Sequence, residues 1–178
     1  DCVIKARLAT QYQGSCRPQK FQATLLYVRE LTHDIREFRF QLPEPIDFLP
    51  GQYALLQLDG VEGPRAYSMS NIAQGGAYWD FQIKRMPGGA GTTMLFDQIK
   101  IGSELTIDGP YGMAYLRTDS PRDITCIAGG SGLAPMISIA RGVAANPAMA
   151  DIKLNLFYGG RTARDICGED LLQALPGF

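Results

Sequence analysis

Histidine, tryptophan and paired cysteines are scarce in this chain. Its 178 residues include one histidine, His33, one tryptophan and four cysteines. No two cysteines have C-x-x-C spacing, so the pattern favours neither a zinc site nor a disulfide framework. We expect no metal site. Cys126 lies in an apolar stretch and is expected to be a buried thiol, whereas His33 stands outside every motif and is expected to be a surface residue.

Long runs of one charge and long apolar runs are also absent. Lysine and arginine number 17 against 18 acidic residues, a formal net charge of -1. Without a basic run, nucleic acid is not an expected partner. The longest stretch without charge, 124–140, contains four glycines or prolines and is shorter than a bilayer-spanning helix of about 20 residues. We expect no membrane association. With no secretory signal pattern, a cytoplasmic location is the working prediction.

Short segments rich in β-branched and aromatic residues fill the first half of the chain. Prolines and glycines separate these segments, a spacing typical of a small antiparallel barrel. A stretch that opens with hydroxyl residues suited to capping, 91–99, has helical apolar spacing and predicts one helix within this half. The predicted strands are 21–28, 35–42, 52–58, 65–70, 78–84 and 104–108.

The second half has longer alternating units. Apolar strands are predicted at 123–130 and 153–160, and helices at 133–145 and 168–175. This βαβ order is typical of a parallel sheet. The predicted fold class is therefore an all-β antiparallel barrel followed by a partial α/β nucleotide-binding domain with a parallel sheet.

Two glycine-rich turns precede helices. GGSGLAP, 129–135, follows a strand, and its glycines permit close approach of a dinucleotide to a helix N-terminus or serve only the backbone geometry of the turn. PGGAGTT, 87–93, lies in the barrel half. Two interpretations are open for this turn. Either its backbone amides hold a pyrophosphate, with Thr92 or Thr93 as the helix cap, or the segment is an ordinary hairpin followed by an N-cap.

Three further motifs carry polar or glycine residues. In RAYS, strand alternation places Arg65 with Tyr67 on one face and Ser68 on the other. These groups suit a phosphate, a planar ring and a hydrogen-bond acceptor, unless they simply form cross-strand polar pairs. In YGGR, 158–161, an arginine ends a parallel strand, so Arg161 and the nearby Arg164 face a ribose or phosphate or are merely solvated. GPYG, 109–112, is interpreted as a tight linker between the halves.

In this order, RAYS, GGAGTT, GPYG, GGSGLAP and YGGR resemble the ferredoxin-NADP reductase superfamily, specifically the NADH-dependent electron-transfer (reductase) components of bacterial multicomponent oxygenases. The resemblance covers residues 20–178. It implies an FAD-binding barrel at 20–112 and a partial NAD(P)-binding α/β domain at 113–178. Residues 1–19 are expected to be a linker or a remnant of a ferredoxin-type domain.

The resemblance also implies roles for individual residues. Arg65 contacts the flavin pyrophosphate, Tyr67 packs beside the isoalloxazine, and the hydroxyl of Ser68 lies near flavin N5, so Ser68 is the expected catalytic residue. The turn before the barrel helix holds the FAD diphosphate through Gly88, Gly89, Gly91 and Thr92. The residues expected to meet the pyridine nucleotide are Gly129, Gly130, Ser131, Gly132, Pro135 and Arg161, with Ser131 in place of the family's usual threonine.

The implied function is a flavoprotein reductase. It passes electrons from NADH, with NADPH possible, through FAD to an iron-sulfur centre of an oxygenase system. Flavin suits this task because it accepts a hydride and releases electrons singly. The implied partners are a ferredoxin-type domain or protein and a terminal oxygenase. The alternatives are a flavin-binding electron-transfer or docking subunit without its own NAD(P)H turnover, and a protein that binds nothing.

The two ends of the chain add expectations. DCVIKARL, 1–8, resembles the last strand of a plant-type [2Fe-2S] domain, but no C-x4-C-x2-C spacing is present, so this chain should bind no cluster itself. The [2Fe-2S] centre is then expected in a missing N-terminal domain or a partner, and the chain is interpreted as a fragment. A later cysteine-glycine-proline segment of the family does not occur before Phe178. FAD binding is therefore better supported by the sequence than hydride transfer.

Overall fold

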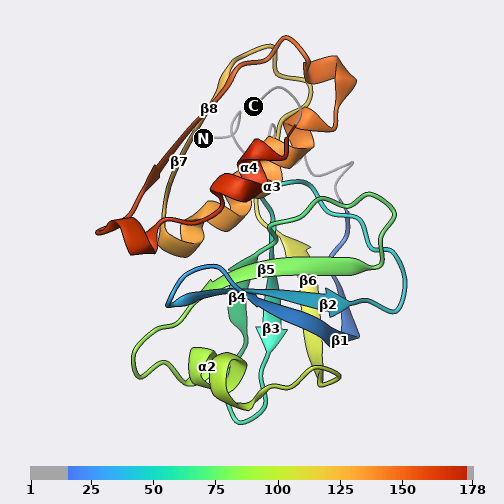
Figure 1. The fold of residues 1–178 in the computed structure, drawn as a ribbon. Coiled ribbons are helices and arrows are strands. Elements are labelled where there is room, and N and C mark those ends of the chain that lie inside the picture. Colours follow the sequence, from blue (N-terminus) through green and yellow to red (C-terminus); the bar gives the residue numbers. More distant parts are fainter. Residues whose placement is uncertain (1–15, 176–178) are drawn as a thin grey trace, which may run out of the picture.

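The protein is described here from a computed structural model, which describes residues 16–175. Figure 1 shows an antiparallel barrel below and a smaller α/β part above it. The barrel is a six-stranded sheet with the order β4-β3-β6-β1-β2-β5. An isolated bridge between Met69 and Phe81 brings the end of β4 to β5 and nearly closes the barrel. Its strands are β1 (Gln19–Glu30), β2 (Ile35–Gln41), β3 (Tyr53–Gln57), β4 (Arg65–Ser68), β5 (Tyr78–Lys84) and β6 (Glu104–Tyr111).

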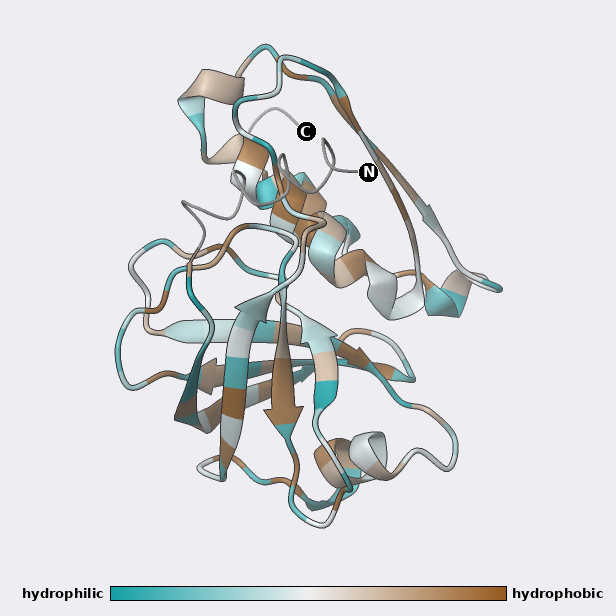
Figure 2. Ribbon diagram, turned by 180° about the vertical axis from the view of Figure 1, so that it is seen from behind, coloured by the Kyte–Doolittle hydropathy of each residue, from teal (hydrophilic) through white to brown (hydrophobic). Residues whose placement is uncertain are grey.

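Aromatic residues fill the interior of the barrel. Phe38, Phe40, Trp79 and Phe81 are fully buried, and the rings of Phe21 and Trp79 pack in a T-shaped arrangement with centroids 5.3 Å apart. Edge-to-face packing of this kind is favourable beyond the burial of apolar area. In Figure 2, brown colour marks the hydrophobic stretches of the barrel strands. The aromatic and β-branched residues on which the strand predictions rest therefore form much of the core.

A short helical segment covers one end of the barrel. α2 (Ala90–Thr93) continues directly into a π-helical turn, Met94–Gln98, which buries Leu95. The predicted helix at 91–99 is present in this two-part form. The predicted cap is wrong, because Gly89 occupies the N-cap position without a side-chain cap, and Thr92 and Thr93 lie inside the helix.

GPYG is not a linker, which corrects the interpretation from sequence. Gly109, Pro110 and Tyr111 are the last residues of β6, where Gly109 pairs with Gln19 of β1 and Tyr111 pairs with Tyr53 of β3. A Cβ atom at Gly109 would approach the Cβ of Ala54 to 2.9 Å. Glycine is needed here because two strands pass too closely for a side chain.

The second part has the predicted βαβ order. β7 (Ile124–Gly129) and β8 (Leu154–Gly159) pair in parallel, in register from Ile124 with Leu154 to Gly129 with Gly159. α3 (Leu133–Ala144) follows a 3-10 turn at Gly130–Gly132, and α4 (Glu169–Gln173) follows β8. Two more 3-10 turns lie at Pro147–Met149 and Ala163–Asp165. In Figure 1, α3 lies between the two-stranded sheet and the barrel.

One face of the small sheet is covered and the other is open. Leu133, Ile137 and Ala140 of α3 and Leu172 of α4 form a compact apolar cluster against the sheet. On the opposite face, Ile127 and Phe157 are direct register partners and are 74% and 60% exposed. The predicted fold class, a barrel followed by a partial α/β domain with a parallel sheet, is confirmed.

The structure also bears on the predictions about the cysteines, membrane-spanning helices and the N-terminal segment. Cys126 is buried as predicted, and within residues 16–175 the cysteines are free thiols. No helix among residues 16–175 is long and apolar enough to cross a membrane. The predicted remnant of a ferredoxin-type domain at 1–19 falls almost entirely outside the described residues.

Candidate functional site

β4 is one of the two outer strands of the barrel sheet, with β5 the other, and it carries the RAYS motif. Arg65, Ala66, Tyr67 and Ser68 lie opposite Leu56, Leu55, Ala54 and Tyr53 of β3. The partners are therefore apolar or aromatic, and cross-strand polar pairing does not explain the polar groups of this motif. A strand paired on one side only leaves its other edge available to a ligand.

The guanidinium of Arg65 has weak partners in this structure. Its Nη1 donates to the carbonyl oxygens of Glu62 at 2.9 Å and Gly63 at 3.1 Å, both in the loop before β4. A phosphate offers a charged acceptor in bidentate geometry, which makes a stronger hydrogen bond than a neutral carbonyl. Arg65 is thus positioned at the barrel surface with donors suited to an anion.

The same arginine touches the glycine-rich turn. A Cβ atom at Gly91 would approach Cγ of Arg65 to 3.1 Å and Cδ1 of Leu58 to 3.3 Å. Glycine at this position therefore lets the turn pass directly over the side chain of Arg65. RAYS and PGGAGTT, separate in the sequence, are therefore neighbours in the fold.

Thr92 holds the glycine turn in shape. Its buried hydroxyl accepts from the backbone N-H of Met86 at 3.1 Å and lies within hydrogen-bond distance of the carbonyl oxygens of Met86 and Gly89, both 3.2 Å away. Gly88 has a φ of 72°, a conformation that favours glycine. The turn is thus preformed, although direct contact of Gly88, Gly89, Gly91 and Thr92 with a ligand stays a prediction.

Tyr67 and Ser68 present a ring and a hydroxyl near the end of β4. Tyr67 is half-buried, and this burial raises the pKa of its phenol. The phenol is therefore neutral at physiological pH. The hydroxyl of Ser68 makes no hydrogen bond to any described residue, and it lies opposite Tyr53, whose ring is 5.9 Å from that of Tyr111.

A cleft of about 1030 Å³ lies between the two parts of the molecule. It runs from the carboxyl ends of β7 and β8 to the end of β5, and its wall includes Pro87, the first residue of the barrel's glycine turn. Open parallel sheets bind ligands at this end of their strands. Predicted nucleotide-binding residues that line the cleft are Gly129, Gly130, Ser131 and Arg161, whereas Gly132 and Pro135 do not.

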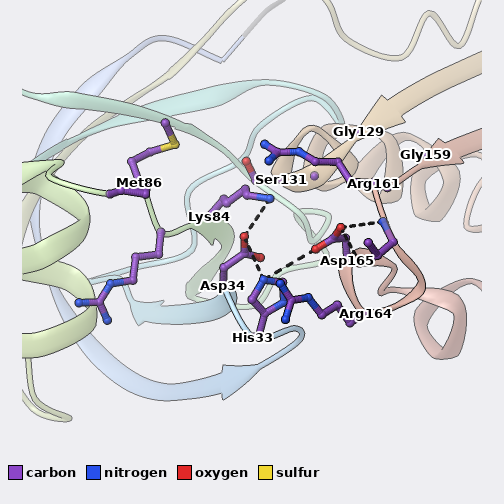
Figure 3. A pocket seen from close by; sticks show the side chains of 15 residues that line it. His33, Asp34, Lys84, Met86, Gly129, Ser131, Gly159, Arg161, Arg164 and Asp165 are labelled. Atoms are coloured by element: carbon purple, nitrogen blue, oxygen red, sulfur yellow. Dashed lines mark hydrogen bonds and ion pairs between the residues drawn. The ribbon is translucent and has the colours of Figure 1, made fainter.

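Charged residues from distant segments meet in this cleft, as Figure 3 shows. Nζ of Lys84 lies 2.9 Å from a carboxylate oxygen of Asp34, and Nε2 of His33 lies 3.7 Å from carboxylate oxygens of both Asp34 and Asp165. His33 is exposed, as predicted for a surface residue, but its surface is the wall of the cleft. The sequence interpretation missed Lys84, Asp34 and Asp165 because no local motif unites them.

The acidic groups of the cleft are already engaged. Asp165 accepts from the backbone N-H of Thr162 at 2.8 Å and from its hydroxyl at 3.0 Å, and these bonds lower the pKa of Asp165. By contrast, Arg161 and Arg164 line the cleft and form no ion pair with any residue in 16–175. The available charge in the cleft is positive and suits a phosphate-containing ligand.

Comparisons with known proteins agree with this arrangement. Residues 22–115 match the oxidoreductase FAD-binding domain family, and residues 126–176 match the oxidoreductase NAD-binding domain family. The chain is 42% identical over 158 residues to the ferredoxin–NAD(+) reductase component of the alkene monooxygenase system of Xanthobacter autotrophicus, which covers 89% of this chain and 47% of that protein.

Two further relatives are similar. A ferredoxin–NAD(P)(+) reductase component of naphthalene 1,2-dioxygenase/salicylate 5-hydroxylase systems from Ralstonia is 40% identical, over 86% of this chain and 46% of that protein. The solved ferredoxin reductase of carbazole 1,9a-dioxygenase superposes with a TM-score of 0.79 at 37% identity, over 86% of this chain and 46% of its own. The chain spans about half the length of the curated relatives it matches.

The family assignment rests on the barrel. Its matched segment covers more than half of the chain and includes both RAYS on β4 and the glycine turn that crosses Arg65. The chain therefore belongs to the oxidoreductase FAD-binding domain family, followed by a segment that matches the oxidoreductase NAD-binding domain family.

Proposed function

We propose that this protein binds FAD on its barrel and a pyridine nucleotide in the adjoining cleft, as the reductase component of an oxygenase system. The contact between Arg65 and Gly91 is the observation that carries the proposal. It joins an anion-binding side chain to a preformed glycine turn on the surface of a barrel that belongs to an FAD-binding family. In this proposal the FAD-binding domain spans 20–112 and the nucleotide domain 113–178.

The residues of β4 and the glycine turn hold the flavin in this proposal. Arg65 exchanges its loop carbonyls for the pyrophosphate, and Gly88, Gly89 and Gly91 allow the backbone to approach it, while Thr92 keeps the turn in shape. The neutral ring of Tyr67 packs beside the flavin. Ser68 provides the free hydroxyl near the reacting edge and is the proposed catalytic residue.

The cleft holds the second substrate. Gly129, Gly130 and Ser131 line it at the end of β7, and Arg161 lines it at the end of β8. Gly132 and Pro135 then act through the shape of the turn, because they follow the lining residues at the start of α3. FAD, when bound, accepts a hydride from the nicotinamide and releases electrons singly. The protein supplies alignment and exclusion of water.

The proposed donor is NADH, with NADPH as an alternative. The proposed acceptor is a [2Fe-2S] centre in a ferredoxin-type domain or protein, which then serves a terminal oxygenase. Relatives named as reductase components of monooxygenase and dioxygenase systems support this assignment. We also propose a cytoplasmic location, because the proposed donor, a reduced pyridine nucleotide, is a cytoplasmic metabolite.

An anaerobic absorption experiment tests the function. The purified chain is mixed with FAD, unbound flavin is removed, and the visible spectrum is recorded before and after NADH or, in parallel, NADPH. We expect flavin bands that are retained with the protein and bleach on addition of the nucleotide. Arg65→Ala should retain much less flavin, and Arg122→Ala, an exposed arginine outside the site, should behave like wild type.

The other outcomes contradict parts of the proposal. Bound flavin that does not bleach with either nucleotide identifies a flavin-binding electron-transfer or docking subunit without its own turnover. A protein that retains no flavin contradicts the proposal as a whole. Faster bleaching by NADPH than by NADH identifies the phosphorylated donor.

A further inference from the structure

α3 makes a specific polar contact with the barrel. Ser138, in the middle of the helix, is completely buried. Its hydroxyl donates to the backbone carbonyl of Asn71 at 2.7 Å and accepts from the backbone N-H of Gly51 at 3.2 Å. One side chain of the nucleotide part thus satisfies a donor and an acceptor that belong to two different segments of the barrel.

These two segments flank the proposed catalytic residue. Ser68 of β4 pairs with Tyr53 of β3, Gly51 lies just before Tyr53, and Asn71 lies just after Ser68. The backbone N-H of Met69 donates to the carbonyl oxygen of Gln52 at 3.1 Å and holds the two segments together. Ser138 is therefore bonded to both segments at one end of this strand pair, the end where Tyr53 and Ser68 lie opposite each other.

The surrounding contacts leave little room for the helix to slide. A Cβ atom at Gly142 would approach Cγ of Pro50 to 2.7 Å, so α3 packs directly on the loop before β3. Nη1 of Arg141 donates to the carbonyl oxygen of Ser70 at 2.9 Å. These contacts hold the helix against the barrel, but among the side chains of α3 only the hydroxyl of Ser138 bonds to both segments within residues 16–175.

We propose that Ser138 is a positioning residue that sets the orientation of the nucleotide part relative to Ser68 on β4. The inference rests on the proposed function for its catalytic consequence. α3 begins at Leu133, directly after the glycine turn that borders the nucleotide cleft, and Ser138 lies about 7.5 Å along the helix at 1.5 Å per residue. A rigid helix transmits the position of Ser138 to that turn.

Loss of the hydroxyl has two consequences. The carbonyl of Asn71 and the N-H of Gly51 lose their side-chain partner in a buried interface, which weakens the attachment of α3. The contacts of Gly142 and Arg141 keep α3 on the barrel, but the nucleotide part is no longer held in one orientation. Hydride transfer is sensitive to this change, because misplacement of reacting groups by about 1 Å slows a reaction about 100-fold.

The direct test measures orientation. Backbone residual dipolar couplings are recorded on the full chain, with and without FAD, and residues 19–111 and 124–173 are fitted separately. For wild type we expect one common alignment tensor. For Ser138→Ala, and for Ser138→Cys of nearly the same volume, we expect a weaker tensor for the nucleotide part. Val143→Ala, on the same helix but lining an apolar groove away from the contact, is the control and should keep one tensor.

A kinetic arm tests the consequence for catalysis. The limiting rate at which saturating NADH reduces bound FAD is measured by anaerobic rapid mixing. This rate should be lower by about tenfold or more in Ser138→Ala, whereas the affinity for FAD should not change. A common tensor in both Ser138 variants overturns the proposal, and separate tensors with an unchanged limiting rate overturn its positioning role. If NADH does not reduce the wild-type flavin at all, the proposed turnover fails, and the tensors alone decide the role of Ser138.

Discussion

At the scale of single residues, the proposed function makes flavin binding depend most on the side chain of Arg65. A hydrogen bond from its guanidinium to the charged pyrophosphate contributes about 1.5 to 3 kcal/mol. We expect Arg65→Ala to raise the dissociation constant of FAD by about 10-fold to 100-fold, measured by calorimetric titration. Arg122→Ala is the matched control. Equal affinity in the two variants would show that Arg65 does not contact the flavin.

A second prediction at this scale concerns Asp34 and the pH dependence of the free energy of unfolding. Partial burial alone would raise the pKa of Asp34, but hydrogen bonds from Lys84 and Thr32 outweigh it and hold the pKa below its ordinary value. The ionised form therefore stabilises the fold above the unfolded pKa of about 4, and this stabilisation is lost as the pH falls through the lower folded pKa.

Replacement of Asp34 by asparagine should follow this dependence. At pH 7 we expect a loss of about 0.5 to 1 kcal/mol in the free energy of unfolding, because solvent partly screens the ion pair with Lys84. The difference from wild type should shrink below pH 4, measured by urea unfolding at several pH values. Asp119→Asn, at an exposed carboxylate without an ion pair in the described part of the chain, is the control. A difference that does not change with pH would contradict the assignment.

At the scale of elements, two adjacent threonines in α2 offer a matched comparison. The hydroxyl of Thr92 accepts a hydrogen bond from the backbone N-H of Met86, whereas the hydroxyl of Thr93 makes no hydrogen bond among residues 16–175. Thr92→Val should cost about 0.5 to 1.5 kcal/mol, because it removes a buried hydroxyl that bonds to backbone groups of Met86 and Gly89. It should also weaken FAD binding, since the glycine turn loses its internal support. Thr93→Val should do neither, and equal effects in urea unfolding and FAD titration would contradict this role of Thr92.

At the scale of the whole molecule, the two parts differ in how much of their apolar surface is covered. The barrel encloses its aromatic core, but one face of the small sheet is exposed and carries Ile127 and Phe157. Elements with few buried contacts open at a lower free energy. We expect amide protons of β7 and β8 to exchange faster than those of β1 and β2, measured by hydrogen exchange. Equal protection would show instead that both parts unfold as one cooperative unit.

Most elements were predictable from local pattern, and the exceptions have physical causes. The strand at 78–84 was predicted with its observed limits because its residues combine strong β propensity with clear turns on both sides. The end of β6 was missed because Gly109 and Pro110 are typical of turns, and only the close approach of Ala54 explains their place in a strand. Thr92 was assigned to a cap because hydroxyls before a helix commonly cap it, but its partners are backbone groups of the preceding turn.

The sequence by itself determined the barrel, the βαβ order and the motifs typical of FAD-binding and NAD-binding oxidoreductase domains, because these depend on spacing along the chain. Only the tertiary structure brought Arg65 against Gly91, gathered His33, Lys84 and Asp165 in one cleft, and placed Ser138 beside the ends of β3 and β4. Such contacts join residues far apart in the chain. Local propensity carries no information about them, because they form only when whole elements pack.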